Sequence, residues 1–332
     1  MFSRRDLLTA SFTAGLAVAS ASAITTPAFA QQTWPQFLSG VRAEARRRGV
    51  SESTLDAALG HIEPIPRVLE LDAHQPEFEF TWDQYRTRIV SAKRIADGRA
   101  HYLPNRALLS DIEQHYGVPA GILVGIWGLE SNYGASTGGF NVIQSLATLA
   151  YEGRRTAFFR SELIDALRIA ETGVPAARMT GSYAGAMGQT QFMPDSFLRY
   201  AVPWKGGSRD IWSDLGSVHA STANYLAHEG WRPGIPWGEK VRAPLNLSAY
   251  DVGRDHRRPA GEWARMGVVR ADGRPLSVPP ATETALLLPG GTTEPNESYV
   301  AYYPSFQAIR RYNPADFYCI CVGLIGDAVI AG

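Results

Sequence analysis

One glutamate stands where it could transfer protons. A helical pattern covers residues 120–130 and ends at a turn over residues 131–134. Counting back three, four and seven residues from Glu130, the only carboxylate of this helix, reaches large apolar side chains: Trp127, Ile126 and Leu123. Burial and the negative end of the helix dipole both disfavour the charged carboxylate, so we expect its pKa to lie above the ordinary value of about 4.3. Such a group could act as a general acid near neutral pH.

The same helix carries three glycines at spacings of four and three: Gly121, Gly125 and Gly128. They predict a shallow groove that admits another backbone or a ligand. An inert, hydrogen-bonded glutamate at a frayed helix end would produce the same local pattern, because shifted carboxylate pKa values are often merely structural. The segment alone therefore leaves both interpretations open.

The rest of the sequence is typical of a mostly helical chain. Apolar residues recur at helical spacing from the first part onward, for example at Phe37, Val41 and Ala45. Between residues 232 and 304, frequent prolines separate short runs such as 240–242 and 286–288, which indicates strands and loops. We predict an α+β fold, mostly α, with these parts: an N-terminal helical region (31–106), a helical core (107–231), a small inserted strand-rich lobe (232–304) and C-terminal helices that complete the core (305–332).

Composition and charge exclude several classes of protein. Of the 332 residues, 32 are Lys or Arg, 32 are Asp or Glu, and 45% are hydrophobic. This balance is that of a globular protein and gives no electrostatic reason to bind a polyanion, so we expect no nucleic-acid partner. The seven histidines contain no pair three or four residues apart, which argues against a zinc enzyme.

Residues 1–30 have the pattern of an export signal. Arg4 and Arg5 precede an Ala-rich apolar run, and residues 28–30 read Ala-Phe-Ala, which fits a cleavage site. The start resembles a twin-arginine signal. Cys319 and Cys321 are the only cysteines, so none is placed for lipid attachment, and their spacing of two on a helix disfavours a mutual disulfide. We expect a periplasmic protein without a membrane anchor.

Three segments carry a family resemblance. Residues 126–134 read Ile-Trp-Gly-Leu-Glu-Ser-Asn-Tyr-Gly, residues 181–194 read Gly-Ser-Tyr-Ala-Gly-Ala-Met-Gly-Gln-Thr-Gln-Phe-Met-Pro, and residues 311–318 read Arg-Tyr-Asn-Pro-Ala-Asp-Phe-Tyr. Over nearly the whole chain after residue 37, the sequence resembles the membrane-bound lytic transglycosylase B family of bacterial peptidoglycan-cleaving enzymes. The resemblance implies a lysozyme-like helical core that binds glycan strands in a cleft, with Glu130 as the sole catalytic acid and base.

By the same resemblance, six further side chains line that cleft: Ser182, Gln191, Tyr225, Tyr312, Asn313 and Tyr318. Amides can donate and accept hydrogen bonds at once, the serine can hydrogen-bond the glutamate or the substrate, and tyrosine faces suit sugar C–H groups. Each also fits a plain structural role. The tyrosines at 225 and 318 stand at helical spacing and could be core, and the asparagine before Pro314 could form a turn.

One departure from the family concerns metal binding. Relatives often carry an acidic, glycine-rich calcium loop shortly after the Gln-Phe-Met-Pro motif. Here residues 202–210 contain one carboxylate and two cations. We therefore predict no bound calcium, no other metal and no cofactor.

The resemblance also implies a reaction. Glu130 would protonate the β-1,4 oxygen between N-acetylmuramic acid and N-acetylglucosamine, and would then remove the proton of the muramyl C6 hydroxyl, which closes a 1,6-anhydro ring. A muramidase that uses water and a peptidoglycan-binding protein without turnover are the alternatives. Glycan strands of peptidoglycan are the expected partners, with cell-wall synthesis or remodelling proteins as further candidates, and we expect a monomer.

Overall fold

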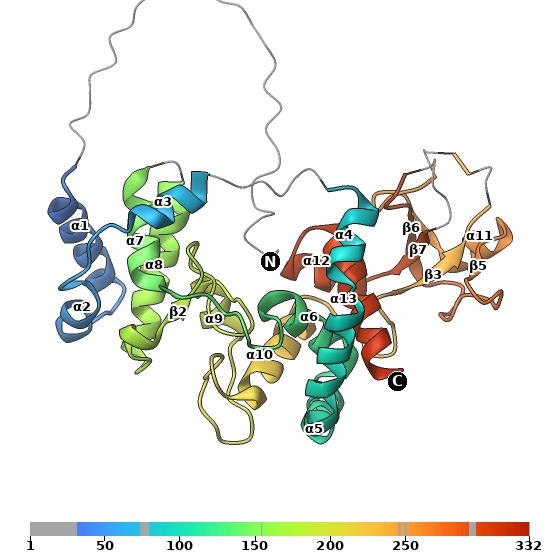
Figure 1. Cartoon of the computed structure of the whole chain (residues 1–332), viewed down its shortest axis with the longest axis horizontal. Helices are drawn as coiled ribbons and strands as arrows, with labels where there is room; N and C mark the ends of the chain where they lie inside the picture. Colours follow the sequence, from blue (N-terminus) through green and yellow to red (C-terminus); the bar gives the residue numbers. More distant parts are fainter. Residues whose placement is uncertain are drawn as a thin grey trace, which may run out of the picture.

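Helices form most of the molecule, and a small sheet lies at one end. The computed structural model describes residues 32–73, 80–153, 155–244, 247–248, 251–291 and 297–331. The predicted export signal, residues 1–30, lies outside the described residues. Figure 1 shows the N-terminal helices at one end of the long axis, the sheet at the other end, and a group of helices between them.

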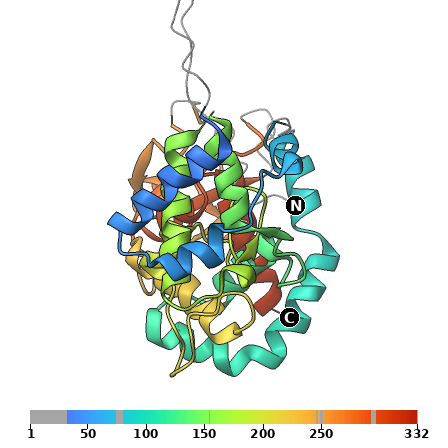
Figure 2. The ribbon, with the colours of Figure 1, turned by 90° about the vertical axis from the view of Figure 1, so that its left-hand side faces the viewer.

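The N-terminal helices cover a pair of helices from later in the chain. They are α1 (Trp34–Arg47), α2 (Glu52–Leu59) and α3 (Pro66–Ala73), and they pack on α7 (Val142–Glu152) and α8 (Thr156–Glu171), as Figure 2 shows from the side. The predicted apolar stripe Phe37, Val41 and Ala45 is buried on α1. The end formed by these helices therefore combines segments that are far apart in the sequence.

A long helix follows the short helix α4 (Trp82–Ile89) and crosses the middle of the fold. Helix α5 (Ala92–Tyr116) contains Pro104 and runs through the boundary that the sequence pattern places between residues 106 and 107. A proline removes one helical hydrogen bond. Here the helix continues because it packs on three core helices, α6 (Ala120–Ser131), α10 (Leu215–His228) and α13 (Asp316–Ile330).

The core helices are completed by two short elements, α9 (Pro194–Tyr200) and α12 (Ser305–Tyr312). Within the described residues no single helix has the length and hydropathy of a membrane span, although α12 and α13, bent by 113° at their junction, reach that hydropathy together. Cys319 and Cys321 on α13 are free and buried, which confirms that they do not bridge each other. Burial raises the pKa of both thiols.

The lobe near the C-terminal end of the chain holds a five-stranded antiparallel sheet. Its strands are β3 (Gly238–Arg242), β4 (Arg257–Pro259), β5 (Val269–Arg270), β6 (Glu283–Leu287) and β7 (Ser298–Tyr302), in the order β4-β6-β7-β3-β5. The register pairs Ala285 with Ala301. Together with α11 (Ala260–Arg265) the sheet encloses a small core of its own around the buried Trp263. Of the two short runs predicted as strands, residues 240–242 fall on β3, and residues 286–288 overlap β6, which ends at Leu287.

A second, two-stranded sheet lies among the central elements. It pairs β1 (Phe140–Asn141) with β2 (Thr180–Gly181), and the short helix η3 (Ala176–Arg178) precedes β2. This pairing fixes the start of the segment that carries the second family motif.

Candidate active site

Helix α6 carries Glu130 in its last turn. All twelve residues of the helix are buried, and Glu130 is 1% exposed. The helix ends because Asn132 and Tyr133 take left-handed backbone conformations, with φ of 49° and 59°. The predicted placement of this carboxylate in an apolar environment, at the negative end of a helix, is confirmed.

Glycines let the backbones of α6 and α13 approach each other closely. A Cβ atom added at Gly121 would lie 3.2 Å from the carbonyl carbon of Gly326, and one added at Gly125 would lie 3.2 Å from that of Val322. From the first contact to the second, the position on α6 advances by four residues and the position on α13 goes back by four. The two helices therefore run antiparallel and touch about once per turn. The predicted glycine groove admits a backbone, that of α13.

The next turn of this helix pair brings Tyr318 to Glu130. The Tyr318 hydroxyl donates a hydrogen bond of 2.7 Å to Glu130 Oε1. Burial, and then the negative charge of Glu130, raise the pKa of Tyr318 well above its ordinary value. The phenol therefore stays protonated and acts as a hydrogen-bond donor to the carboxyl group.

The two other predicted tyrosines lie in an aromatic cluster with Phe192, in which the rings meet edge-on or tilted. Tyr312 and Tyr225 have ring centroids 4.9 Å apart, and each lies 5.8 Å from Phe192. Their hydroxyls donate to backbone carbonyls, from Tyr312 to Thr190 at 2.5 Å and from Tyr225 to Arg311 at 2.6 Å. Both tyrosines thus fasten the motif loop and the end of α12 to each other.

The loop after β2 holds the predicted polar residues in fixed positions. The Gln191 side chain donates to the carbonyls of Thr137 and Gly188 at 2.9 and 2.8 Å. Its backbone is left-handed, with φ of 52°, a conformation that non-glycine residues rarely adopt and that clusters at functional sites. Ser182 Oγ accepts a hydrogen bond of 2.8 Å from the Ala186 amide, and its own proton can still be donated.

Asn313 occupies the turn between α12 and α13. Its Oδ1 accepts from the Ala315 amide at 3.1 Å, which is the turn role that a residue before Pro314 can have. The residue is buried, five positions before Tyr318. The structure therefore places all seven predicted residues in the interior, on α6, α10, α12, α13 and the loop after β2.

Two residues that the sequence analysis did not single out position helix α6. Gln189 accepts a 2.7 Å hydrogen bond from Trp127 Nε1 and donates 2.8 Å to the Trp212 carbonyl. His219 packs perpendicular to the Trp127 ring at 4.8 Å, and burial lowers the pKa of His219 to about 4. Gln189 lies inside the second motif, and this position could have identified it as a site residue. No sequence pattern singles out His219.

The loop that holds calcium in some relatives is built differently here. The Lys205 ammonium pairs with Asp111 of α5. Asp210 accepts hydrogen bonds from the Trp212 amide and from Ser213. In the described residues no three His, Cys, Asp or Glu side chains lie together as metal ligands. The residues present do not fit a calcium ion, which needs six or more oxygen ligands.

Comparison with known proteins agrees with this geometry. Residues 33–327 match the family model described as the transglycosylase SLT domain. Membrane-bound lytic murein transglycosylase B of Escherichia coli (strain K12) is 30% identical over 267 residues, which cover 75% of this chain and 67% of that protein.

Solved structures give the same result. SltB3 of Pseudomonas aeruginosa in complex with NAG-NAM-pentapeptide is 41% identical, has a TM-score of 0.86, and is matched over 91% of this chain and 80% of that chain. Soluble lytic transglycosylase SltB1 of the same organism is 30% identical with a TM-score of 0.77, over 90% and 99% of the two chains. The chain therefore belongs to the transglycosylase SLT domain family and is a lytic transglycosylase with a lysozyme-like helical core.

Proposed function

We propose that Glu130 is the single acid and base with which this lytic transglycosylase cleaves the β-1,4 bond between N-acetylmuramic acid and N-acetylglucosamine. The observation that carries this assignment is the buried carboxyl group at the end of α6, held by the Tyr318 hydroxyl. Burial and the helix C-terminus disfavour the anion, and the hydrogen bond from Tyr318 favours it. The mechanism needs the protonated form when the glycan binds.

The reaction follows in two proton transfers. Protonated Glu130 gives its proton to the glycosidic oxygen as the bond to C1 of the muramyl residue breaks. The resulting carboxylate takes the proton of the C6 hydroxyl, and O6 bonds to C1 to form the 1,6-anhydro ring. Glu130 ends protonated, as it began, and no water is consumed. Tyr318 stabilises the carboxylate between the two transfers, because hydrogen bonds to a charged group are stronger than those to a neutral one.

Polar side chains among the remaining predicted residues bind the glycan strand. Ser182 and Asn313 offer a hydroxyl proton and an amide group to sugar hydroxyls and N-acetyl groups. Tyr225 and Tyr312 are buried and hold the surrounding backbone in position through their hydroxyls. The strained backbone of Gln191 supports a functional role for this residue, because such conformations cluster at functional sites. The hydrogen bonds of its own side chain hold that backbone in place.

We also propose that the enzyme acts in the periplasm, after export by the signal in residues 1–30. The twin-arginine pattern around Arg4 and Arg5 supports this route. Peptidoglycan strands are then the natural partner, in line with the NAG-NAM-pentapeptide that the similar SltB3 binds.

Glu130→Gln tests the assignment. The amide keeps the shape of the side chain but supplies no titratable proton, so turnover of purified sacculi should fall by at least 10³-fold while the free energy of unfolding stays within about 1 kcal/mol of the parent. Mass spectrometry of the parent digest should show muropeptides one water lighter than hydrolysed ones. Hydrolysed products would indicate a muramidase, and full turnover by the variant would remove Glu130 from the mechanism.

A further inference from the structure

A hollow of about 600 Å³ lies between the outer face of α5 and the turn that follows α9. None of its lining residues belongs to the proposed active site. They are Ala107, Leu108, Ser110, Asp111, Gln114, Trp204 and Lys205. The volume falls in the range of pockets that bind small ligands.

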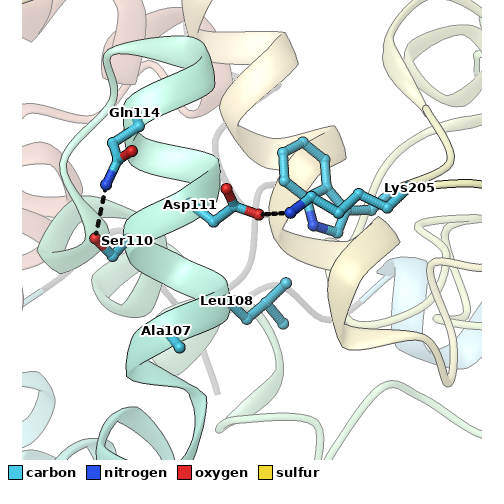
Figure 3. A pocket seen from close by; sticks show the side chains of 7 residues that line it. Ala107, Leu108, Ser110, Asp111, Gln114 and Lys205 are labelled. Atoms are coloured by element: carbon cyan, nitrogen blue, oxygen red, sulfur yellow. Dashed lines mark hydrogen bonds and ion pairs between the residues drawn. The ribbon is translucent and has the colours of Figure 1, made fainter.

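Helix α5 presents one continuous stripe to this hollow. Ala107, Ser110, Asp111 and Gln114 follow each other at spacings of three, one and three, which places them on one face of the helix. The first two side chains are small, so they leave room, and the last two carry polar groups. Figure 3 shows the Gln114 amide directed along the helix toward Ser110, and Asp111 directed across the hollow toward Lys205.

The opposite wall is an indole ring that is held in place. A Cβ atom added at Gly216 of α10 would lie 3.1 Å from Trp204 Cβ, so this glycine lets the ring side chain lie against the start of that helix. His115 and Tyr116 flank the indole, with centroids 5.6 and 6.3 Å away. Trp204 is half-buried, and the Lys205 ammonium lies over its ring at 5.6 Å from the centroid, so a ligand that stacks on the indole displaces this side chain. A preorganised aromatic surface loses little entropy when a ligand stacks on it.

The charged groups of the hollow cancel. Asp111 and Lys205 form an ion pair whose side chains are 41% and 67% exposed, and such exposed pairs contribute little to stability. A ligand can therefore open this pair at little cost and use both partners as hydrogen-bonding groups. With no net charge, the hollow matches a neutral ligand better than a phosphate, an acidic peptide or a lipid headgroup.

We propose that this hollow is a second carbohydrate site, which takes one or two N-acetylated sugar units of a glycan strand. The indole of Trp204 offers an apolar face to sugar C–H groups. Ser110, Gln114 and the two charged side chains offer donors and acceptors to hydroxyl and acetamido groups. In naming the strand as peptidoglycan, the inference depends on the proposed function. A polymer held at a second point stays at a high effective concentration near Glu130.

The test uses N,N′,N″-triacetylchitotriose as the probe and Glu130→Gln protein, so that nothing is cleaved. The indole N–H signal of Trp204 is followed by NMR and assigned by its loss in Trp204→Phe. In Glu130→Gln protein with no further substitution, we expect this signal to shift and saturate with a millimolar Kd. Ala107→Arg places a long side chain in the hollow without removing a native contact, and should weaken this binding at least tenfold.

Ala100→Arg is the matched control. It makes the same substitution at an exposed position of α5, seven residues earlier, and should leave the titration as in the parent. A Trp204 signal that does not move with the trisaccharide, or that moves equally in Ala107→Arg, overturns the second site. These results are independent of the proposed function, which is tested by the products that wild-type and Glu130→Gln protein release from sacculi.

Discussion

Replacement of Tyr318 by phenylalanine removes a single hydroxyl group from the proposed catalytic centre. The ring stays in its buried position, and Glu130 Oε1 loses a 2.7 Å hydrogen bond. Hydrogen bonds to charged groups contribute about 1.5–3 kcal/mol. If this bond acts fully on the carboxylate that forms between the two proton transfers, kcat on sacculi falls about 10- to 150-fold.

The pH dependence separates this role from general damage. A hydrogen bond to the charged form lowers the pKa of a carboxyl group, so its loss should raise the pKa of Glu130. Because the first step needs the protonated acid, the alkaline limb of the kcat profile should move to higher pH. The assay is release of soluble muropeptides from sacculi between pH 4 and 9.

Tyr133→Phe is the control. Tyr133 is also buried near the end of α6, and its hydroxyl donates to the Arg94 carbonyl at 2.9 Å instead of to the carboxyl group. This variant should leave the alkaline limb where it is, whatever its stability. An unmoved limb in Tyr318→Phe, or one that moves to lower pH, would show that the hydroxyl does not act on the ionisation of Glu130.

Two further predictions concern stability. His219 has an ordinary pKa of 6.5 that burial lowers to about 4, so the unfolded chain binds a proton in this window and the folded protein does not. The free energy of unfolding should therefore fall by about 3 kcal/mol as the pH drops from 6.5 to 4. In urea titrations at several pH values, His219→Leu should lose this part of the pH dependence. An equal pH dependence in the variant would contradict the lowered pKa of His219. Gly125→Ala puts a methyl group against the Val322 backbone and should lower the free energy of unfolding by about 1–3 kcal/mol or more, whereas Gly139→Ala, with no atom within 4 Å of the added carbon, should change it by less than 1 kcal/mol. Equal effects of the two alanines in the same titrations would refute the close approach of the helices.

Local patterns predicted the elements that depend on nearest neighbours. The position of Glu130 on an apolar stripe followed from a spacing of three and four residues, and the structure has that helix with the expected ends. The spacing of the glycines also predicted a groove on this helix, but it did not predict that α13 fills the groove. The boundary predicted between residues 106 and 107 falls inside α5, which also continues through Pro104 because contacts with distant helices outweigh one lost hydrogen bond.

Contacts between distant residues were beyond such patterns. Tyr318 lies 188 residues after Glu130, and only the family resemblance placed it near the site. The backbone partners of Tyr312 and Tyr225 had no signal in the sequence at all, because a carbonyl group carries no residue identity. His219 had no signal either, because its packing against Trp127 depends on a contact between residues that are far apart in the sequence.

The use of one carboxyl group for two proton transfers explains why its surroundings are rigid. The first transfer goes to the glycosidic oxygen and the second comes from the C6 hydroxyl, so either the acid or the sugar must move between them. Glu130 is fixed by Tyr318, by the glycine contacts between α6 and α13, and through Trp127 by Gln189. The sugar is therefore the part that moves, and a substitution that loosens α6 should slow the second transfer more than it weakens binding, because binding tolerates small displacements that proton transfer does not.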